Sequence, residues 1–235
     1  MVKKKISGKT KAIIINSPHN PTGTLITEED IKQLERIIKS TQILIVSDEV
    51  YEHITFNNKK HISFASSPEL SKRTFVISSF GKTYHTTGWK MGYCAAPENL
   101  MKEFRKIHQF IIFSVNTPIQ YAYAEFMKKE DKYLSLGKFY QHKRDVFTKA
   151  LESGTEKSKF KIKKCDGTYF QLLDYSSIAD KNDLEFSEYL TKEIGVAVIP
   201  LSPFYESRGS KSLIRICFAK KDEMLLEAAS RLKKI

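Results

Sequence analysis

The first half of the chain alternates short apolar runs with longer amphipathic segments. Residues 11–16 and 42–50 are continuous apolar runs, which are typical of strands covered on both faces. Between them, residues 27–40 place isoleucine and leucine at helical spacing behind a threonine cap and an acidic first turn, which predicts a helix. Residues 73–80 and 91–97 repeat the strand pattern. This alternation predicts an α/β fold with a mostly parallel sheet.

After Pro97 the pattern changes to helices followed by a mixture of helices and strands. The predicted helices cover residues 97–113, with Pro97 as the first helical residue, then 114–129, 132–153, the region near 186–194, and a last segment from Asp222. The predicted strands are a hairpin over 159–176 around the turn dipeptide Asp166–Gly167, and the runs 196–200 and 213–219. We therefore predict a partial large domain over residues 1–120 and a smaller α+β domain over 121–235.

Composition agrees with a globular protein and excludes several other classes. The chain has 235 residues, 41% of them hydrophobic, but its apolar runs are far shorter than the ~20 residues of a membrane helix. The basic first residues have no apolar segment behind them, as a signal peptide would, so we expect a cytoplasmic protein without a membrane partner. Cys94, Cys165 and Cys217 are far apart, which favours reduced, buried thiols over disulfides or a metal site.

The net charge of +12 would permit nucleic-acid binding. However, the lysines are spread along the chain, mostly beside acids or at predicted helix ends. We therefore expect a solvated basic surface and no nucleic-acid partner. Binding whose salt dependence indicated several phosphate contacts would be needed to restore that alternative.

Polar side chains follow three of the predicted strands. Asn20 lies in a Pro–Gly turn after the first strand, Asp48 ends the second, and Ser79 ends the third. Ligands of parallel sheets bind outside the carboxyl ends of the strands, and a carboxylate after an apolar strand needs a cationic partner. The alternatives are an ordinary turn for Asn20 and a helix cap or surface salt bridge for Asp48.

Two lysines and a hydroxyl lie close together in residues 78–93. Lys82 and Lys90 are eight residues apart, and like charges repel unless an anion lies between them. Ser79 and Lys90 could bind a phosphate, and a partly desolvated Lys82 could attack a carbonyl. The alternative for Lys82 is a solvated surface lysine.

Arg215, between two isoleucines, could bind a carboxylate as a two-pronged fork or form a salt bridge on an edge strand.

The motifs together resemble one family. Asn-Pro-Thr-Gly, Asp-Glu-Val-Tyr, Ser-x-x-Lys, Gly-Trp-Lys-x-Gly and Ile-Arg-Ile occur in that order, which closely resembles the class I, fold-type I aminotransferases that use pyridoxal phosphate. Residues 14–23, 78–93 and 108–118 are most similar to the methionine and kynurenine (glutamine-type) branch. The resemblance covers essentially the whole chain. It implies that residues 1–120 are part of the cofactor-binding large domain, and it implies a homodimer.

The resemblance implies a role for each cofactor-binding residue. Lys82 would form the imine with the cofactor's aldehyde and then move the proton, an acid–base contribution of ~10²–10⁴-fold. Asp48 would pair with the protonated pyridine nitrogen. Asn20 and Tyr51 would bind the ring's 3-oxygen, and the Asn20–Pro21 bond would be cis.

Ser79 and Lys90 would bind the phosphate, although many relatives carry arginine at the position of Lys90. Arg215 would hold the substrate's α-carboxylate together with Asn20. Phe113 would line the substrate's side-chain pocket in the neighbouring subunit, and its alternative is packing in the core.

The predicted function is transfer of an amino group from a neutral amino acid (methionine, aromatic or glutamine-like) to a 2-oxo acid. A β-lyase that cleaves cysteine conjugates could use the same residues. An inactive fragment that serves only as an assembly partner is the second alternative.

Only 19 residues precede Asn20, whereas the family carries a long segment there. That segment supplies strands, an aromatic side chain that stacks on the pyridine, phosphate donors and dimer contacts. We therefore expect a truncated product, one half of a split gene, or an expressed fragment. Alone it should bind pyridoxal phosphate weakly and transaminate poorly, and a complementing N-terminal half should restore activity.

Overall fold

The computed structural model describes residues 2–153, 158–206 and 212–235. The chain forms two compact units, which we describe separately. The first comprises Met1–Pro18, Leu25–His53 and Lys60–Leu136, and the second comprises His19–Thr24, Ile54–Lys59 and Gly137–Ile235. The division at residue 120 that we predicted for folding domains stays a prediction.

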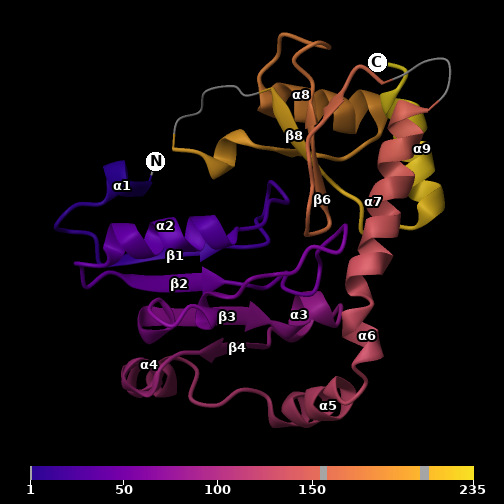
Figure 1. Ribbon diagram of the computed structural model, residues 1–235. Coiled ribbons are helices and arrows are strands. Elements are labelled where there is room, and N and C mark those ends of the chain that lie inside the picture. The colour runs from indigo at the N-terminus through magenta and orange to yellow at the C-terminus, as the bar shows by residue number, and fades with distance from the viewer. Residues whose placement is uncertain (1, 154–157, 207–211) are drawn as a thin grey trace. The chain divides into compact units, whose positions relative to one another are not determined.

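The first unit contains a four-stranded sheet in the order β1 (Ala12–Asn16), β2 (Leu44–Asp48), β3 (Thr74–Ser79) and β4 (Gly92–Ala95) (Figure 1). The first three strands are parallel, and β4 is antiparallel to β3. Residues 80–91 connect β3 to β4, its neighbour in the sheet. The predicted α/β class with a mostly parallel sheet is confirmed.

Helix α2 (Glu28–Ile38) forms the core on one face of this sheet. Thr27 caps the helix as predicted: its hydroxyl accepts from the Asp30 N–H, and the Asp30 carboxylate accepts from the Thr27 N–H at 2.9 Å. The helix buries Ile31, Leu34 and Ile38 in a cluster with Ile45 of β2. The apolar residues at helical spacing thus form the buried face of α2, and α2 is the crossover helix that connects β1 to β2.

The remaining described α-helices of the first unit are α1 (Val2–Lys5), α3 (Phe80–Thr83), α4 (Glu98–Ile111), α5 (Thr117–Met127) and α6 (Asp131–Leu134). Helix α4 lies near the second face of the sheet, where the rings of Phe104 and Phe75 are 6.3 Å apart. Pro97 is the N-cap of α4 and not its first helical residue, a small correction. The single helix predicted over 132–153 is interrupted at Ser135, which separates α6 from α7.

The second unit contains an antiparallel sheet in the order β5 (Lys161–Ile162), β6 (Phe170–Asp174), β8 (Leu213–Cys217) and β7 (Ile199–Pro200). Its helices are α7 (Leu136–Glu152), α8 (Asp183–Tyr189), which continues into a π-helical turn over 190–194, and α9 (Asp222–Leu232). Tyr175 and Phe186 stack at 4.0 Å and are fully buried. The predicted hairpin is confirmed, because β5 pairs with β6 across residues 163–169.

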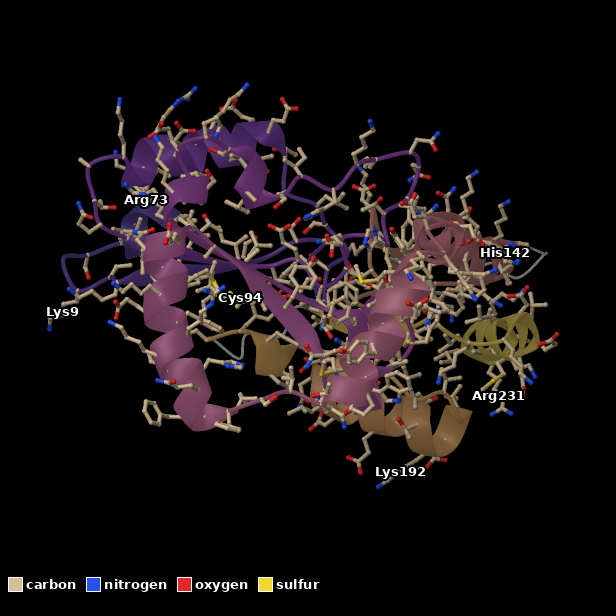
Figure 2. All side chains as sticks on the ribbon, turned by 90° about the horizontal axis from the view of Figure 1, so that it is seen from below. Lys9, Arg73, Cys94, His142, Lys192 and Arg231 are labelled. Atoms are coloured by element: carbon tan, nitrogen blue, oxygen red, sulfur yellow. The ribbon has the colours of Figure 1, made fainter. Side chains whose placement is uncertain are left out.

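Within residues 2–153, 158–206 and 212–235, no helix is long and apolar enough to cross a membrane, and no group of three or more His, Cys, Asp or Glu side chains could hold a metal ion. All three cysteines are free thiols; Cys165 is buried, whereas Cys94 and Cys217 are half-buried. Basic side chains such as Lys9 and Lys192 project outward from the ribbon (Figure 2).

Candidate functional site

Asp48 and Ser79 lie on one face of the first unit's sheet, at the carboxyl ends of β2 and β3. Asp48 pairs in register with Ile77, and Ser79 is two residues farther along β3. Because side chains alternate across a strand, Ile77 and Ser79 share the face of Asp48. The Asp48 carbonyl accepts from the Asn16 side chain at 2.9 Å, and its carboxylate accepts from the Val50 N–H at 3.2 Å.

The segment that follows β3 closes on itself and brings Ser79 next to the peptide that joins Met91 to Gly92. The Ser79 hydroxyl and the Phe80 N–H both donate to the Met91 carbonyl, at 3.3 and 3.2 Å. Lys90 is exposed and has left-handed backbone geometry, with φ of 55°. Gly92 lies opposite Ser79 in the sheet. The return of the chain to β4 therefore places the Ser79 hydroxyl against the backbone of Met91, the residue that follows Lys90.

Lys82 is carried on α3, which begins at Phe80 and has Ser79 as its N-cap. The Gly81 N–H donates to the Ser79 hydroxyl at 3.1 Å, and the Gly81 carbonyl accepts from the Thr86 N–H at 3.0 Å. A Cβ added to Gly81 would lie 2.9 Å from the Thr87 Cα, so only glycine allows this close approach. Lys82 is half-buried, so it is not the fully solvated lysine of the alternative interpretation.

Aromatic side chains that our sequence reasoning did not single out surround α3. Phe80 stacks on Tyr123 of α5 at 4.7 Å, and the Tyr123 hydroxyl lies 2.5 Å from the Thr86 hydroxyl. The Tyr93 ring is 5.6 Å from Phe80, and its hydroxyl donates to Glu52 at 2.8 Å. Burial, together with this hydrogen bond, raises the pKa of Tyr93 to about 12. No local sequence pattern links these rings, because they come from distant segments.

Tyr51 lies in the turn after β2 and is buried, with 3% of its surface exposed. Phe113 follows the C-cap of α4, has φ of 62° and is 86% exposed. The core-packing alternative for Phe113 is therefore wrong in this chain. Its neighbours Phe110 and Ile111 are also exposed, at 86% and 72%.

In the second unit, Arg215 contacts Asn20, which lies 195 residues earlier in the sequence. The guanidinium donates to the Asn20 side-chain oxygen at 2.5 Å. It also lies over the Phe170 ring, 4.1 Å from the centroid, and 5.5 Å from that of Phe204. Strand β8 lies between β6 and β7, so the edge position that we considered for Arg215 is wrong.

The loop that carries Asn20 is packed against the turn of the β5–β6 hairpin. The Asn20–Pro21 bond is cis, as predicted. The Gly23 carbonyl accepts from the Asp166 N–H at 2.8 Å, and a Cβ on Gly23 would lie 2.7 Å from the Cys165 sulfur. Burial raises the pKa of Cys165 to about 12, which agrees with an inert buried thiol.

The chemistry of the residues in the first unit fits pyridoxal phosphate. The carboxylate of Asp48 suits a protonated pyridine nitrogen, and the amine of Lys82 suits an aldehyde. The hydroxyl of Ser79 and the ammonium of Lys90 suit a phosphate. These four groups come from the strand ends and from the single 79–91 segment that joins them.

Comparison with known proteins identifies relatives over nearly the full chain. The family model for aminotransferase class I and II matches residues 2–232. A methionine aminotransferase from Escherichia coli is 47% identical over 231 residues, covering 98% of this chain and 59% of that protein. Kynurenine–oxoglutarate transaminase 3 from Rattus norvegicus is 36% identical over 94% of this chain and 52% of its own length.

Solved structures agree with these matches. An Escherichia coli protein whose structure and reactivity identified a methionine aminotransferase function superimposes with a TM-score of 0.95 at 46% identity, covering 100% of this chain and 60% of that one. N-succinyldiaminopimelate aminotransferase from Mycobacterium tuberculosis has a TM-score of 0.91 at 32% identity, over 99% of this chain and 60% of that one. The chain thus spans about 60% of the length of these two structures. Because the family model covers almost every residue, the chain belongs to aminotransferase class I and II, a family of pyridoxal-phosphate-dependent enzymes.

Proposed function

We propose that this chain is part of a transaminase that moves the amino group of a neutral amino acid to a 2-oxo acid. The preferred donors would be methionine, aromatic or glutamine-like amino acids. The observation that carries the proposal is the convergence of Asp48, Ser79 and the Lys82 helix on one end of the first unit's sheet. The 47% identity to a methionine aminotransferase supports this class of substrate.

Pyridoxal phosphate would supply an aldehyde that takes up the amino group and a ring that withdraws charge from the α-carbon. In this proposal the Asp48 carboxylate keeps the proton on the pyridine nitrogen. The Lys82 amine would bind the cofactor's aldehyde, and as an acid–base group it would carry the substrate proton. Ser79 and Lys90 bind the phosphate, where the lysine contributes a point charge and not the two-pronged fork of an arginine.

Asn20 and Tyr51 take the role of ring-oxygen donors in this proposal, and Arg215 binds the substrate's α-carboxylate. Stacking on Phe170 and the contact with Asn20 restrict the Arg215 side chain before any substrate arrives. A restricted guanidinium loses less entropy when it binds a carboxylate. These contacts therefore support Arg215 as the carboxylate-binding residue.

We also propose that the active enzyme is a homodimer. The exposed aromatic and aliphatic side chains at the end of α4, including Phe110, Ile111 and Phe113, form an apolar patch of the kind that marks protein interfaces. In a dimer, Phe113 would line the substrate pocket of the partner subunit. The chain spans about 60% of the length of these relatives, and a complementing N-terminal half is the alternative partner in this proposal.

Borohydride reduction in the presence of pyridoxal phosphate tests the proposal directly. We expect peptide mass analysis to show Lys82 modified at a lower cofactor concentration than the exposed lysines. Lys72, which pairs with Glu69 on the surface of the same unit, is the internal control. Equal labelling of Lys82 and Lys72 at every concentration would contradict the proposed cofactor site.

A further inference from the structure

A buried carboxylate follows Asp48 directly and faces the other side of the sheet. Glu49 is 1% exposed. Four donors surround its oxygens: the Ser47 hydroxyl at 2.7 Å, the Ser63 hydroxyl and the Phe64 N–H at 3.1 Å each, and His61 Nε2 at 2.8 Å. Phe64 belongs to the core cluster that includes the buried face of α2, so Glu49 is anchored on the core side of the sheet.

The hydrogen bonds show that Glu49 is held as an ion. Burial by itself would raise the pKa of Glu49, but the hydrogen bonds from His61, Ser47 and Ser63 hold it below its ordinary value. Since a carboxylate only accepts, His61 Nε2 carries a proton toward it. The other ring nitrogen, Nδ1, is buried and has no hydrogen-bond partner among the described residues, which favours the tautomer that leaves Nδ1 without a proton.

The backbone around Glu49 connects this anchor to the proposed cofactor residues. The Glu49 N–H donates to the Ile77 carbonyl at 2.8 Å, and its carbonyl accepts from the Glu52 N–H at 2.9 Å. Within that turn, the Val50 N–H donates to the Asp48 carboxylate at 3.2 Å. The turn 49–52 also contains the buried Tyr51. Holding the Glu49 side chain therefore holds the donor to Asp48 and the backbone of Tyr51.

We propose that Glu49 is a positioning residue: it ties the turn 49–52 to the segment 61–64 and so fixes Asp48 and Tyr51 on the cofactor side. The proposal rests on the proposed function, because Asp48 and Tyr51 take their roles from it. Glu49 itself contacts neither cofactor nor substrate, since its carboxylate is enclosed by protein donors on the core side.

Glu49→Gln is the discriminating variant. Its side-chain oxygen can keep the three donors from Ser47, Ser63 and Phe64, but its amide group then faces His61 Nε2. To accept from that amide, His61 must move its proton to Nδ1, which is buried without a partner. Thr27→Ala is the matched control, because it removes the capping box of α2 in the same unit and leaves the turn 49–52 unchanged.

Amide hydrogen exchange of the chain without cofactor is the first measurement. We expect Val50 and Glu52 to exchange at least about tenfold faster in Glu49→Gln than in Thr27→Ala, after correction for global stability. The second measurement is the dissociation constant for pyridoxal phosphate, followed by absorbance. It should rise about tenfold in Glu49→Gln and stay within about twofold in Thr27→Ala, because only the first change loosens the binding residues.

Equal exchange and equal dissociation constants in the two variants would overturn the proposal. If the unaltered chain takes up no pyridoxal phosphate, the proposed function fails, while hydrogen exchange still decides whether Glu49 holds the turn. Should Glu49→Gln not fold, His61→Phe removes one donor and keeps the carboxylate. It should accelerate exchange at Val50 and Glu52 by about threefold, and unchanged exchange there would count against the anchor.

Discussion

Gly92 offers a sharp test of how the 79–91 segment is closed. A Cβ on Gly92 would lie 2.5 Å from the Ser78 carbonyl oxygen and 3.5 Å from the Ser79 Cα. The nearer atom belongs to the backbone of β3 and cannot rotate away, so Gly92→Ala must push β4 from β3. That movement would separate Ser79 from the Met91 carbonyl, which now accepts from it at 3.3 Å.

The size of the effect follows from the contact. Overpacking against a fixed backbone costs about 1–3 kcal/mol, and a 2.5 Å approach to an oxygen belongs at the upper end of that range. For a chain of this length, about 2–3 kcal/mol corresponds to a fall in Tm of roughly 4–12 °C. Loss of the contact at Ser79 should also weaken binding of pyridoxal phosphate.

Gly88→Ala is the control, because a Cβ there meets nothing within 4 Å. It lies in the same segment and should leave Tm unchanged or raise it slightly, since alanine restricts the unfolded chain by about 0.4–1 kcal/mol. Thermal unfolding followed by circular dichroism measures both variants under one buffer condition. If Gly92→Ala were as stable as Gly88→Ala, the close approach of β3 and β4 would not constrain the segment as we argue.

Three further predictions concern single side chains. The folded pKa of Glu49 lies below its ordinary value of 4.5, so the stability that the ionised carboxylate contributes is present above pH 4.5 and is lost as the pH falls through the folded pKa. Acid denaturation curves should therefore be steeper for the unaltered chain than for Glu49→Gln. Identical slopes for the two chains would refute this. Cys165, with a pKa of about 12, should resist a thiol reagent at neutral pH until the chain unfolds, whereas rapid labelling of the folded chain would show that the thiol is accessible. Phe113→Ala should weaken methionine or aromatic substrates far more than alanine in the active assembly, and equal losses for all substrates would argue against its pocket role. Pyruvate release from a cysteine conjugate in the same assay would reveal the alternative β-lyase reaction.

The sequence by itself determined the elements whose signals are local. The apolar runs of β1, β2 and β3, and the capping box at Thr27 with the helix behind it, were all predicted within a residue or two. These features depend on contacts between residues at most four apart, which composition and spacing reveal directly. The candidate site residues Lys82, Asp48 and Arg215 were predicted from motif order and family resemblance, and only in part from local physics.

The tertiary structure decided what depends on distant contacts. The antiparallel direction of β4, the break at Ser135 and the aromatic rings packed around α3 had no local signal. The anchor at Glu49 needs donors from residues 12 to 15 positions away, and Arg215 meets Asn20 across 195 residues. A residue pattern specifies which face of a helix or strand is apolar. The contacts between polar side chains form only when packing brings the ends of distant strands together.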